Sequence, residues 1–484
     1  MARGQPPLEH LLRRAGFGAS VDDLATFGPL SMAAALDRLL DYQRVADDVD
    51  ARIGQPEYVG ITTRGQFSPN TNIDDARQRW LFRMVHSPRP LQEKMALFWH
   101  NHFATAYSKV ADGVGAMQAT KMLALKAGEL RGPQGQLELF RERGLGNFRE
   151  LLVEVARDPA MLVWLDGRTN TRQRPQENFA REIMELFTFG IGNYTEQDVY
   201  AAARVFTGWN LRLVGARDDQ NGYYEFVYNA NQHETAAKEF TFAIYPDGSR
   251  TIPARSASAG MQDGLDFIAA LARHPETARR LARKLWNYFV SEAAPPEPDF
   301  VSSAAAVYLQ ADTEIGAVVH FILRSRWFQN PGYWYSRYSW PAEFVVRAIK
   351  EVGWNGLSID AARGPMTAMG QTLFEPPDVN GWELGTGWFS TGGMLARMNF
   401  AATLAFNQRF NLGREAASAR SSPTDLISFF LDRLSPSAYD REPYDALVAY
   451  LDAGAAWPAS DAQLQAKTSG LARLIVGSSE YQLV

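Results

Sequence analysis

Apolar residues recur three or four positions apart along most of this chain, which is the spacing of an amphipathic α-helix. After Pro90, for example, Leu91, Met95 and Phe98 share one face of a helix that the proline can begin. Ser20 and Thr195 each precede an aspartate by three positions, a pattern that caps the start of a helix. The same reasoning predicts helices near residues 30–42, 74–86, 114–128, 147–156, 176–189, 195–207, 261–273, 276–290, 297–309, 315–325, 339–352, 391–408, 423–434, 441–453 and 460–477.

Two regions depart from this periodicity. Between residues 210 and 253, the β-type runs 223–228 and 240–245 are separated by Asp, Asn and Gly residues that favour turns. The stretch 370–393 is rich in Gly and Pro and holds two tryptophans. The chain is therefore predicted to be mainly α, a large multi-helix domain with a small inserted β hairpin or meander.

The composition of the chain argues against several classes of function. With 484 residues, 46% hydrophobic and 21% charged, the chain has the balance of a folded protein with a sizeable core. Its 49 Lys and Arg against 54 Asp and Glu give a net charge of −5, which argues against a nucleic-acid partner. The absence of cysteine excludes disulfides, thiolate nucleophiles and Cys-ligated metals. The sequence also lacks P-loop, dinucleotide-binding, G-x-S-x-G and H-E-x-x-H motifs.

The N-terminal segment 1–20 carries basic residues but lacks the apolar stretch and cleavage site of a secretory signal. The apolar runs farther along the chain are too short to span a bilayer. We therefore expect a cytoplasmic chain with no membrane span. The alternative is a periplasmic or extracellular protein whose signal was removed or is carried by a partner.

Two histidines lie one residue apart in the segment 98–103, in a chain with only 7 histidines. Imidazole is a general base near neutral pH and a ligand for Zn, Fe or Mn. On a continuous helix, however, His100 and His102 would point about 200° apart and could not share one metal ion. The alternative is one histidine in the core and one at the helix end. We expect at least one of them to line the site.

The segment 177–185 places polar residues on one side of a predicted helix and apolar residues on the other. Glu177 and Arg181, and Arg181 and Glu185, are spaced for ion pairs along the helix. This side is either a solvated ion-paired face or the wall of a cleft that presents Glu182 and Glu185 for acid–base work or metal ligation.

Two loop-borne stretches are further candidates. His233, followed by Lys238, could bind an anion or a metal, or form a polar turn of the β insertion. In the stretch 370–388, prolines and the turn at Asn380 place Trp382 and Trp388 on loops. Indole faces beside polar side chains stack on sugar rings, but they also anchor loops onto a core.

Several strings of this sequence occur in the order typical of one family: 10–18 (HLLRRAGFG), 98–103 (FWHNHF), 177–182 (ENFARE), 207–209 (TGW) and 376–382 (PPDVNGW). The chain resembles the bacterial "domain of unknown function 1800" family. The resemblance implies a helical family core domain over residues 1–410, with a C-terminal helical segment, 411–484, packed on it. It also implies export and a sulfatase-like partner protein encoded nearby, although this chain shows no export signal of its own.

Two hypotheses follow. The first is a hydrolase-type enzyme acting on a glycan or other polar polymer, assisted by one divalent metal ion or by none. Its expected catalytic residues are Glu182, Glu185, His100 and His233, its metal ligands His100, His102 and Glu182, and its substrate-binding residues Trp382, Trp388, Arg181, Asn178, Lys238 and Asn380. The second is a non-catalytic helical partner or chaperone of the sulfatase-like protein, which would expose a large apolar patch.

Overall fold

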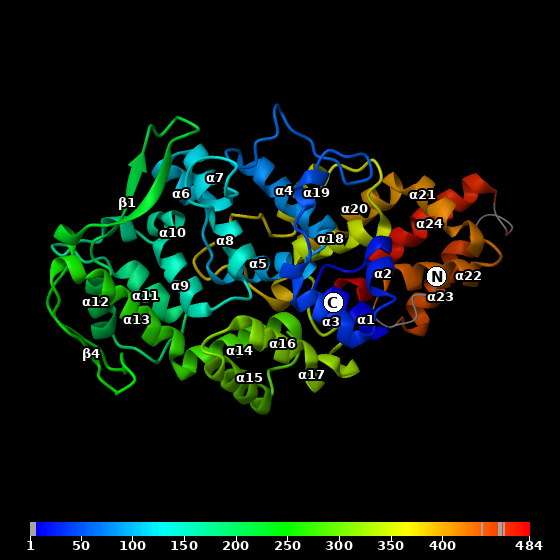
Figure 1. Ribbon diagram of the computed structural model, residues 1–484. Helices are drawn as coiled ribbons and strands as arrows, with labels where there is room; N and C mark the ends of the chain where they lie inside the picture. Colours follow the sequence, from blue (N-terminus) through cyan, green and yellow to red (C-terminus); the bar gives the residue numbers. More distant parts are fainter. Residues whose placement is uncertain (1–5, 437–438, 454–456, 458–459) are drawn as a thin grey trace.

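The computed structural model describes residues 6–436, 439–453, 457 and 460–484 (Figure 1). The first half of the chain forms α1 (Pro6–Arg14), α2 (Val21–Phe27), α3 (Met32–Leu40), α4 (Ile73–His86), α5 (Pro90–His102), α6 (Tyr107–Val114), α7 (Ala116–Ala124), α8 (Gln136–Arg143), α9 (Phe148–Arg157), α10 (Pro159–Trp164), α11 (Glu177–Glu185) and α12 (Glu196–Val205). The second half forms α13 (Met261–Arg273), α14 (Pro275–Phe289), α15 (Pro298–Gln310), α16 (Ile315–Arg324), α17 (Arg326–Gln329), α18 (Pro341–Val352), α19 (Asp360–Ala368), α20 (Thr391–Asn407), α21 (Arg409–Glu415), α22 (Pro423–Leu434), α23 (Arg441–Asp452) and α24 (Asp461–Val476).

The prediction of a mainly α protein is confirmed, and each predicted helix range contains a helix. Both capping boxes are formed, with Ser20 bonded to Asp23 and Thr195 to Asp198. The periodicity did not predict seven of the helices in the described part of the chain: α1, α6, α8, α10, α17, α19 and α21. Most of these are short, and a helix of two turns gives too few repeats to establish a period.

The β insertion lies where it was predicted, but one of its strands was assigned wrongly. Strand β2 (Tyr223–Tyr228) pairs antiparallel with β1 (Trp209–Val214), and β3 (Lys238–Glu239) pairs with β4 (Thr251–Ile252). Residues 240–245 are not a strand. Their apolar members instead reach inward, where Phe240 and Phe242 pack on Phe267 of α13. The β-type run 240–245 therefore reflects apolar side chains buried against a helix and not the pairing of strands in a sheet.

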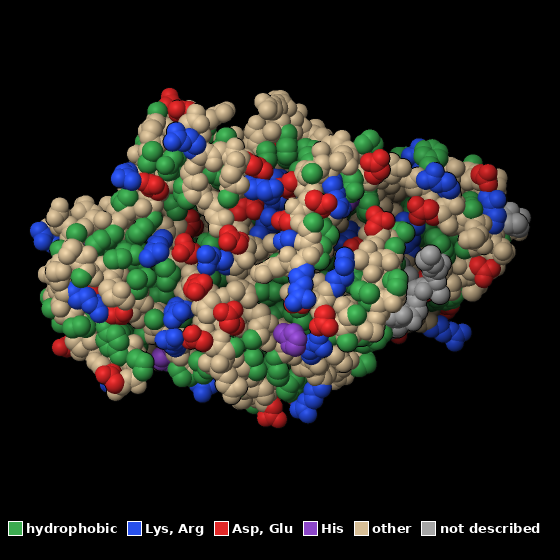
Figure 2. Space-filling model, in the orientation of Figure 1, with side chains coloured by type: hydrophobic (Ala, Val, Ile, Leu, Met, Phe, Trp, Pro, Cys, Tyr) green, Lys and Arg blue, Asp and Glu red, His purple; other side chains and the backbone are tan. Residues whose placement is uncertain are grey.

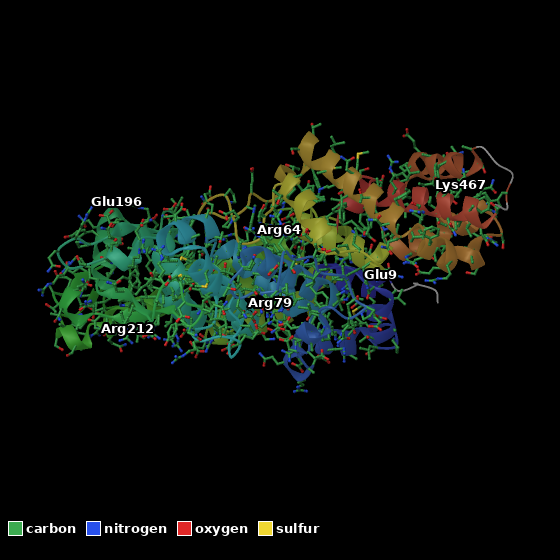
Figure 3. All side chains as sticks on the ribbon, turned by 90° about the horizontal axis from the view of Figure 1, so that it is seen from above. Glu9, Arg64, Arg79, Glu196, Arg212 and Lys467 are labelled. Atoms are coloured by element: carbon green, nitrogen blue, oxygen red, sulfur yellow. The ribbon has the colours of Figure 1, made fainter. Side chains whose placement is uncertain are left out.

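The molecule is elongated, and α5 lies near its middle. Figure 1 places α9–α13 and both hairpins at one end and α20–α24 at the other. Figure 3 shows the same arrangement from above, with Glu196 and Lys467 at opposite ends. The C-terminal helices pack on α18 and α20. On the face in Figure 2, acidic and basic side chains are interspersed over the central helices.

Helix α5 lies in the core of the molecule. All of its residues except Asn101 are buried. It packs against α8 and α4, and its C-terminal end approaches α14 and the loop 374–384. No helix in the described ranges is both long and apolar enough to cross a bilayer.

Candidate active site

The two neighbouring histidines of α5 point into different surroundings. The helix continues through His102, which is the condition under which the two rings diverge. His100 lies among Trp80, Phe374 and Trp382 and accepts a hydrogen bond from the Phe374 N–H at 3.0 Å. Burial lowers the pKa of His100 to about 3, so its ring is neutral. His100 is thus the core histidine of the pair.

His102 instead contacts α14. Its Nε2 lies 3.1 Å from the Phe187 carbonyl, which can only accept, so Nε2 carries the proton. Nδ1 is therefore the acceptor for Lys284 Nζ, 2.9 Å away. Burial, together with the charges of Lys284 and Arg280, holds the pKa of His102 well below its usual value.

Lys284 is the unusual group at this site. Burial, and secondarily the charge of Arg280, lowers the pKa of Lys284 to about 7. Within the described residues no carboxylate lies within ion-pair distance of its ammonium group. A lysine in this state carries a substantial neutral fraction at neutral pH and can accept a proton.

Lys284 and His102 line a small cavity of about 50 Å³. Phe98, Tyr288, Trp340 and Leu384 form its apolar walls, and Asn101, Asn287 and Glu292 add polar groups. Both carboxylate oxygens of Glu292 accept hydrogen bonds, from the Tyr338 N–H at 3.0 Å and the Trp340 indole at 3.3 Å. An apolar pocket with a few convergent polar groups and a lysine of perturbed pKa is typical of an active site.

The loop that carries Trp382 docks directly onto this end of α5. The Trp382 N–H donates to Asn101 Oδ1 at 2.8 Å, and the indole lies 5.4 Å from the His100 ring. Gly381 allows this approach because it has φ +84° and because a Cβ there would lie 2.3 Å from Asn101 Oδ1. The strings at 98–103 and 376–382 therefore meet in space.

The residues that follow α11 reach this end of α5 through the Phe187 carbonyl, but the polar side chains of α11 lie elsewhere. Arg181 pairs with Glu196 at 2.8 Å and with Glu177 at 3.5 Å, so the polar face is ion-paired. Glu185 accepts a hydrogen bond from the Tyr194 hydroxyl. Asn178 and Glu182 also lie outside the cavity: Asn178 donates to Asp166 at 3.2 Å, whereas burial and then Glu185 raise the pKa of Glu182.

His233 and Lys238 belong to a separate buried cluster centred on Asp263. His233 Nε2 lies 3.2 Å from Asp263 Oδ2, Lys238 donates to the same carboxylate, and Arg255 pairs with its other oxygen. His233 Nδ1 lies 2.9 Å from the Thr207 carbonyl. His233, Lys238 and Asp263 are 0% exposed, and none of the three lines the cavity at α5.

Both loop tryptophans are buried, Trp382 being 4% and Trp388 5% exposed. Trp388 packs 6.3 Å from the Trp340 ring. Neither indole face lies open to solvent, so both anchor the loop on the core. Asn380 is exposed at the turn, where its N–H donates to Asp378.

The structure does not assemble His100, His102 and Glu182 into a ligand set. The Nε2 of His100 and both ring nitrogens of His102 already have hydrogen-bond partners. Across the described ranges, no group of three or more His, Cys, Asp or Glu side chains is arranged to hold a metal ion.

Sequence reasoning missed Lys284, Asn287 and Glu292. The periodicity of α14 predicts its core residues, such as Leu281 and Leu285, and a lysine at the margin of that face looks like any surface lysine. Only the contact with His102, 182 positions away, distinguishes it.

Comparison with known proteins supplies the family. No curated protein and no solved structure matches this chain. One family model matches residues 10–483, including the C-terminal helices. Because this match covers nearly the whole chain, the protein belongs to the family described as "Protein of unknown function (DUF1800)".

Proposed function

We propose that this protein is a hydrolase-type enzyme whose catalytic centre is the cavity at the end of α5. The observation that carries the proposal is the 2.9 Å contact between Lys284 Nζ and the unprotonated Nδ1 of His102, at the wall of a part-apolar pocket. Lys284 accepts a proton from water there, and the water attacks the substrate. His102 holds the amine in place and stays neutral.

The polar groups around the lysine suit the attack of water on a carbonyl carbon. Asn101 uses its Oδ1 for the Trp382 N–H, which leaves its NH₂ group to donate to an oxygen that gains negative charge. Asn287 lines the same cavity and offers a second amide. The oxyanion formed by this attack would be stabilised by neutral donors while the proton rests on Lys284. When the intermediate collapses, the C–O bond to the alcohol breaks, and Lys284 returns its proton to the departing alkoxide.

The cavity restricts the reacting group. A volume of about 50 Å³ admits a small group, such as an acetyl ester, but not a sugar ring. Leu384 is 37% exposed and lines the cavity, so the pocket reaches the surface. A small acyl group carried by a glycan or other polar polymer therefore fits this site better than the polymer chain itself.

The first experiment uses p-nitrophenyl acetate as the probe substrate. Lys284→Met should lower kcat/KM by about 100-fold or more, the usual contribution of a general base. Lys284→Arg should also be inactive, because arginine keeps its proton at neutral pH. Lys109→Met, at a half-exposed lysine outside the cavity, is the matched control. Wild-type turnover that Lys284→Met leaves unchanged would refute the proposal.

A second readout does not depend on the substrate. Competitive acetylation with acetic anhydride, followed by mass spectrometry, measures how the reactivity of each lysine changes with pH. Lys284 should become reactive with a midpoint near pH 7 because burial lowers its pKa. A midpoint near 10.4, the value of a free lysine, would contradict the assignment.

An exposed apolar strip favours a second candidate, a binding partner for another protein. Leu395, Met398 and Phe406 lie on one side of α20 and are 49–59% exposed. Phe410 of α21 and Leu474 of α24 are exposed as well, and Met398 and Leu474 both lie near Gly477. The partner suggested by the family resemblance is the sulfatase-like protein.

This second candidate is tested by co-expression of the two proteins and affinity purification. Leu395→Glu and Phe406→Glu should abolish a complex that forms through the strip, whereas Leu309→Glu on α15 is the control. Failure of the wild-type proteins to co-purify would argue against a partner role.

A further inference from the structure

The solvent-facing side of α20 carries no charge. Leu395, Met398 and Phe406 form an apolar strip along it and are 58%, 49% and 59% exposed. The one charged residue of the helix, Arg397, is buried. The remaining exposed residues are uncharged as well: Thr391, Gly392, Asn399, Thr403 and Asn407. Because a surface helix normally presents charged residues to water, this pattern indicates that another surface covers the outer side of α20.

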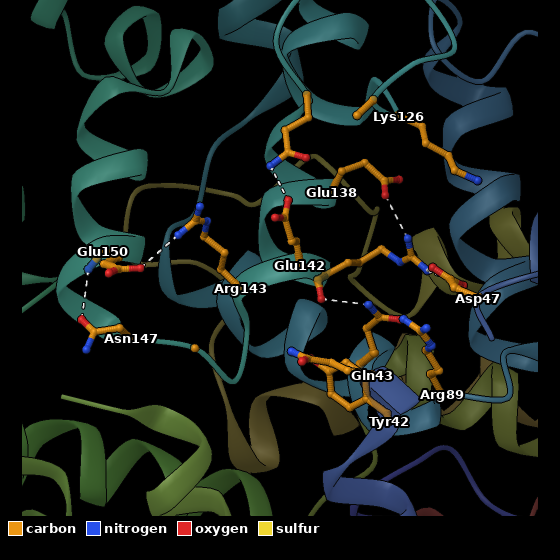
Figure 4. A pocket seen from close by; sticks show the side chains of 15 residues that line it. Tyr42, Gln43, Asp47, Arg89, Lys126, Glu138, Glu142, Arg143, Asn147 and Glu150 are labelled. Atoms are coloured by element: carbon orange, nitrogen blue, oxygen red, sulfur yellow. Dashed lines mark hydrogen bonds and ion pairs between the residues drawn. The ribbon is translucent and has the colours of Figure 1, made fainter. Parts of the chain in front are cut away.

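Elsewhere on the molecule, exposed charges pair with one another. In the cleft of about 640 Å³ that α8 and α9 line, for example, Arg143 pairs with Glu150 at 3.2 Å (Figure 4). By contrast, residues 384–414 contain three arginines and no acidic residue. The outer side of α20 is therefore not an ion-paired, solvated face.

The apolar strip of α20 is spaced evenly about Ala402. Met398 lies four residues before Ala402 and Phe406 lies four residues after it, and residues four apart share one side of a helix. Leu395 extends the same side toward the start of the helix. Ala402 is small and partly exposed, so a second helix can approach closely there. A strip with this symmetry is complementary to itself when a two-fold axis passes through Ala402.

We propose that α20 packs against α20 of a second copy of this chain, in an antiparallel two-fold contact centred on Ala402. In this contact, Phe406 of each copy packs against Met398 of the partner subunit, and both apolar pairs leave the solvent. Leu395 then lies beside the end of the partner's helix that follows Phe406.

The position of Arg409 favours the antiparallel direction. Its guanidinium carbon lies 4.2 Å from the centre of the Phe406 ring and 4.4 Å from that of Phe410, at one end of the strip. An antiparallel contact keeps the two copies of Arg409 about 20 Å apart, since each lies seven residues from the axis at Ala402. That separation exceeds the screening length of about 8 Å at physiological salt, whereas a parallel contact would bring the two charges together.

A second copy fits this strip better than an unrelated protein does. Interfaces between identical chains are the more apolar ones, whereas complementary charges set the specificity between different proteins, and the outer side of α20 offers no charge. The sulfatase-like protein of the second candidate function would use the same strip, so the two are alternative occupants. The inference is independent of the reaction at Lys284.

The first measurement is the mass of the full chain in solution, by size-exclusion chromatography with light scattering at about 100 μM. We expect twice 54.0 kDa for the wild type. Ala402→Glu places two like charges at the two-fold axis and should give the monomer mass with a wild-type circular dichroism spectrum. Phe406→Ser, which removes the largest apolar side chain of the strip, should do the same. Leu309→Glu, at an exposed leucine of α15, is the matched control and should remain dimeric.

Cysteine cross-linking tests the direction of the contact, because the chain has no cysteine of its own. Ala402→Cys should form a disulfide-linked dimer on mild oxidation, since facing residues of two packed helices lie within disulfide range. Leu395→Cys should not, because the two copies of this position lie about 20 Å apart in an antiparallel pair.

A wild type that stays monomeric at about 100 μM overturns the proposal. In that case, co-purification with the sulfatase-like protein that Leu395→Glu abolishes would assign the strip to that protein, and binding to phosphatidylglycerol vesicles would assign it to a lipid surface. A dimer that persists in both Ala402→Glu and Phe406→Ser overturns the location. A disulfide that forms as readily in Leu395→Cys as in Ala402→Cys overturns the antiparallel arrangement.

Discussion

Lys284 on α14 donates a hydrogen bond to Nδ1 of His102 at the end of α5, and this contact joins a neutral imidazole to an amine of lowered pKa. The imidazole is held neutral by burial, and the pKa of the amine is lowered to about 7 by burial and by Arg280. Burying such a pair destabilises the fold, because the lysine keeps its proton more readily in the unfolded chain. The burial of Lys284 should therefore make the free energy of unfolding depend on pH.

Lys284→Met should stabilise the protein at low pH. The unfolded lysine holds its proton up to about pH 10.4, whereas folded Lys284 releases it near pH 7. The unfolded state therefore binds more protons between these values, and the wild type gains stability as pH rises through this window. At pH 6 the variant should be more stable by about 1–3 kcal/mol, and at pH 10 the difference should vanish.

Urea denaturation at pH 6, 8 and 10 measures this difference directly. Lys109→Met serves as the control for removal of one exposed positive charge. A difference between wild type and Lys284→Met that does not change with pH would show that burial of Lys284 does not affect its proton affinity.

Asp263→Asn should destabilise the protein without altering the chemistry at α5. The Asp263 carboxylate is 0% exposed and is shared by His233, Lys238 and Arg255, so the asparagine would leave the buried Lys238 ammonium group without its counter-charge. Breaking such a cluster costs about 3–5 kcal/mol. Asp266→Asn, at the neighbouring partly exposed acid, should cost less. Thermal unfolding measures the loss, and p-nitrophenyl acetate turnover of the folded fraction should stay at the wild-type level.

Long helices could be predicted from the sequence, whereas several short elements could not. Long helices such as α14 and α20 extend over several turns, and both ranges were predicted within two residues at each end. Helix α10 is only six residues long and buried throughout, so no polar face reveals its period. The strand β1 was missed: the only β-type runs assigned in this region were 223–228 and 240–245, although the sequence of β1, WNLRLV, alternates apolar and polar positions over most of its length.

The candidate site was predicted only where its residues are close in sequence. His102 was found because a second histidine lies two positions away, and the divergence of His100 followed from helix geometry. Lys284 could not be found in this way, since its importance comes from burial beside His102 and not from its neighbours on α14. Conversely, His233 and Lys238 looked reactive in sequence because Asp263, which pairs with both, lies 25 or more positions away.

His100 should remain neutral across the mildly acidic range. Burial lowers its pKa to about 3, against 6.5 for a histidine in the unfolded chain. The unfolded state therefore binds more protons between these values, so this residue contributes stability above pH 6.5 that is lost as pH falls toward 3. Long-range ¹H–¹⁵N spectra from pH 7.5 to 5 should show a constant neutral ring for His100. A chemical shift that titrates near pH 6, as in the urea-unfolded chain, would contradict its placement in the core.

Gly381→Ala tests whether the loop 376–382 holds the site together, and Gly385→Ala, at the first residue of the following 3₁₀ turn η7 (Gly385–Phe389), is the control. Both glycines have a positive φ, +84° and +74°, so alanine is strained by about 1 kcal/mol or more at either position. They differ in surroundings: a Cβ at Gly381 would lie 2.3 Å from Asn101 Oδ1 and 2.5 Å from the Asn101 carbonyl, whereas no atom lies within 4 Å of one at Gly385.

Because a backbone atom of buried α5 cannot move aside, the loop must shift in Gly381→Ala, and Trp382 loses its hydrogen bond to Asn101. We expect a total loss of about 2–4 kcal/mol for Gly381→Ala and about 1 kcal/mol for Gly385→Ala. Hydrogen exchange at the Trp382 amide should accelerate only in Gly381→Ala, and turnover of p-nitrophenyl acetate should fall with it. Equal effects of the two substitutions would mean that backbone strain alone matters and that contact with Asn101 does not position the site.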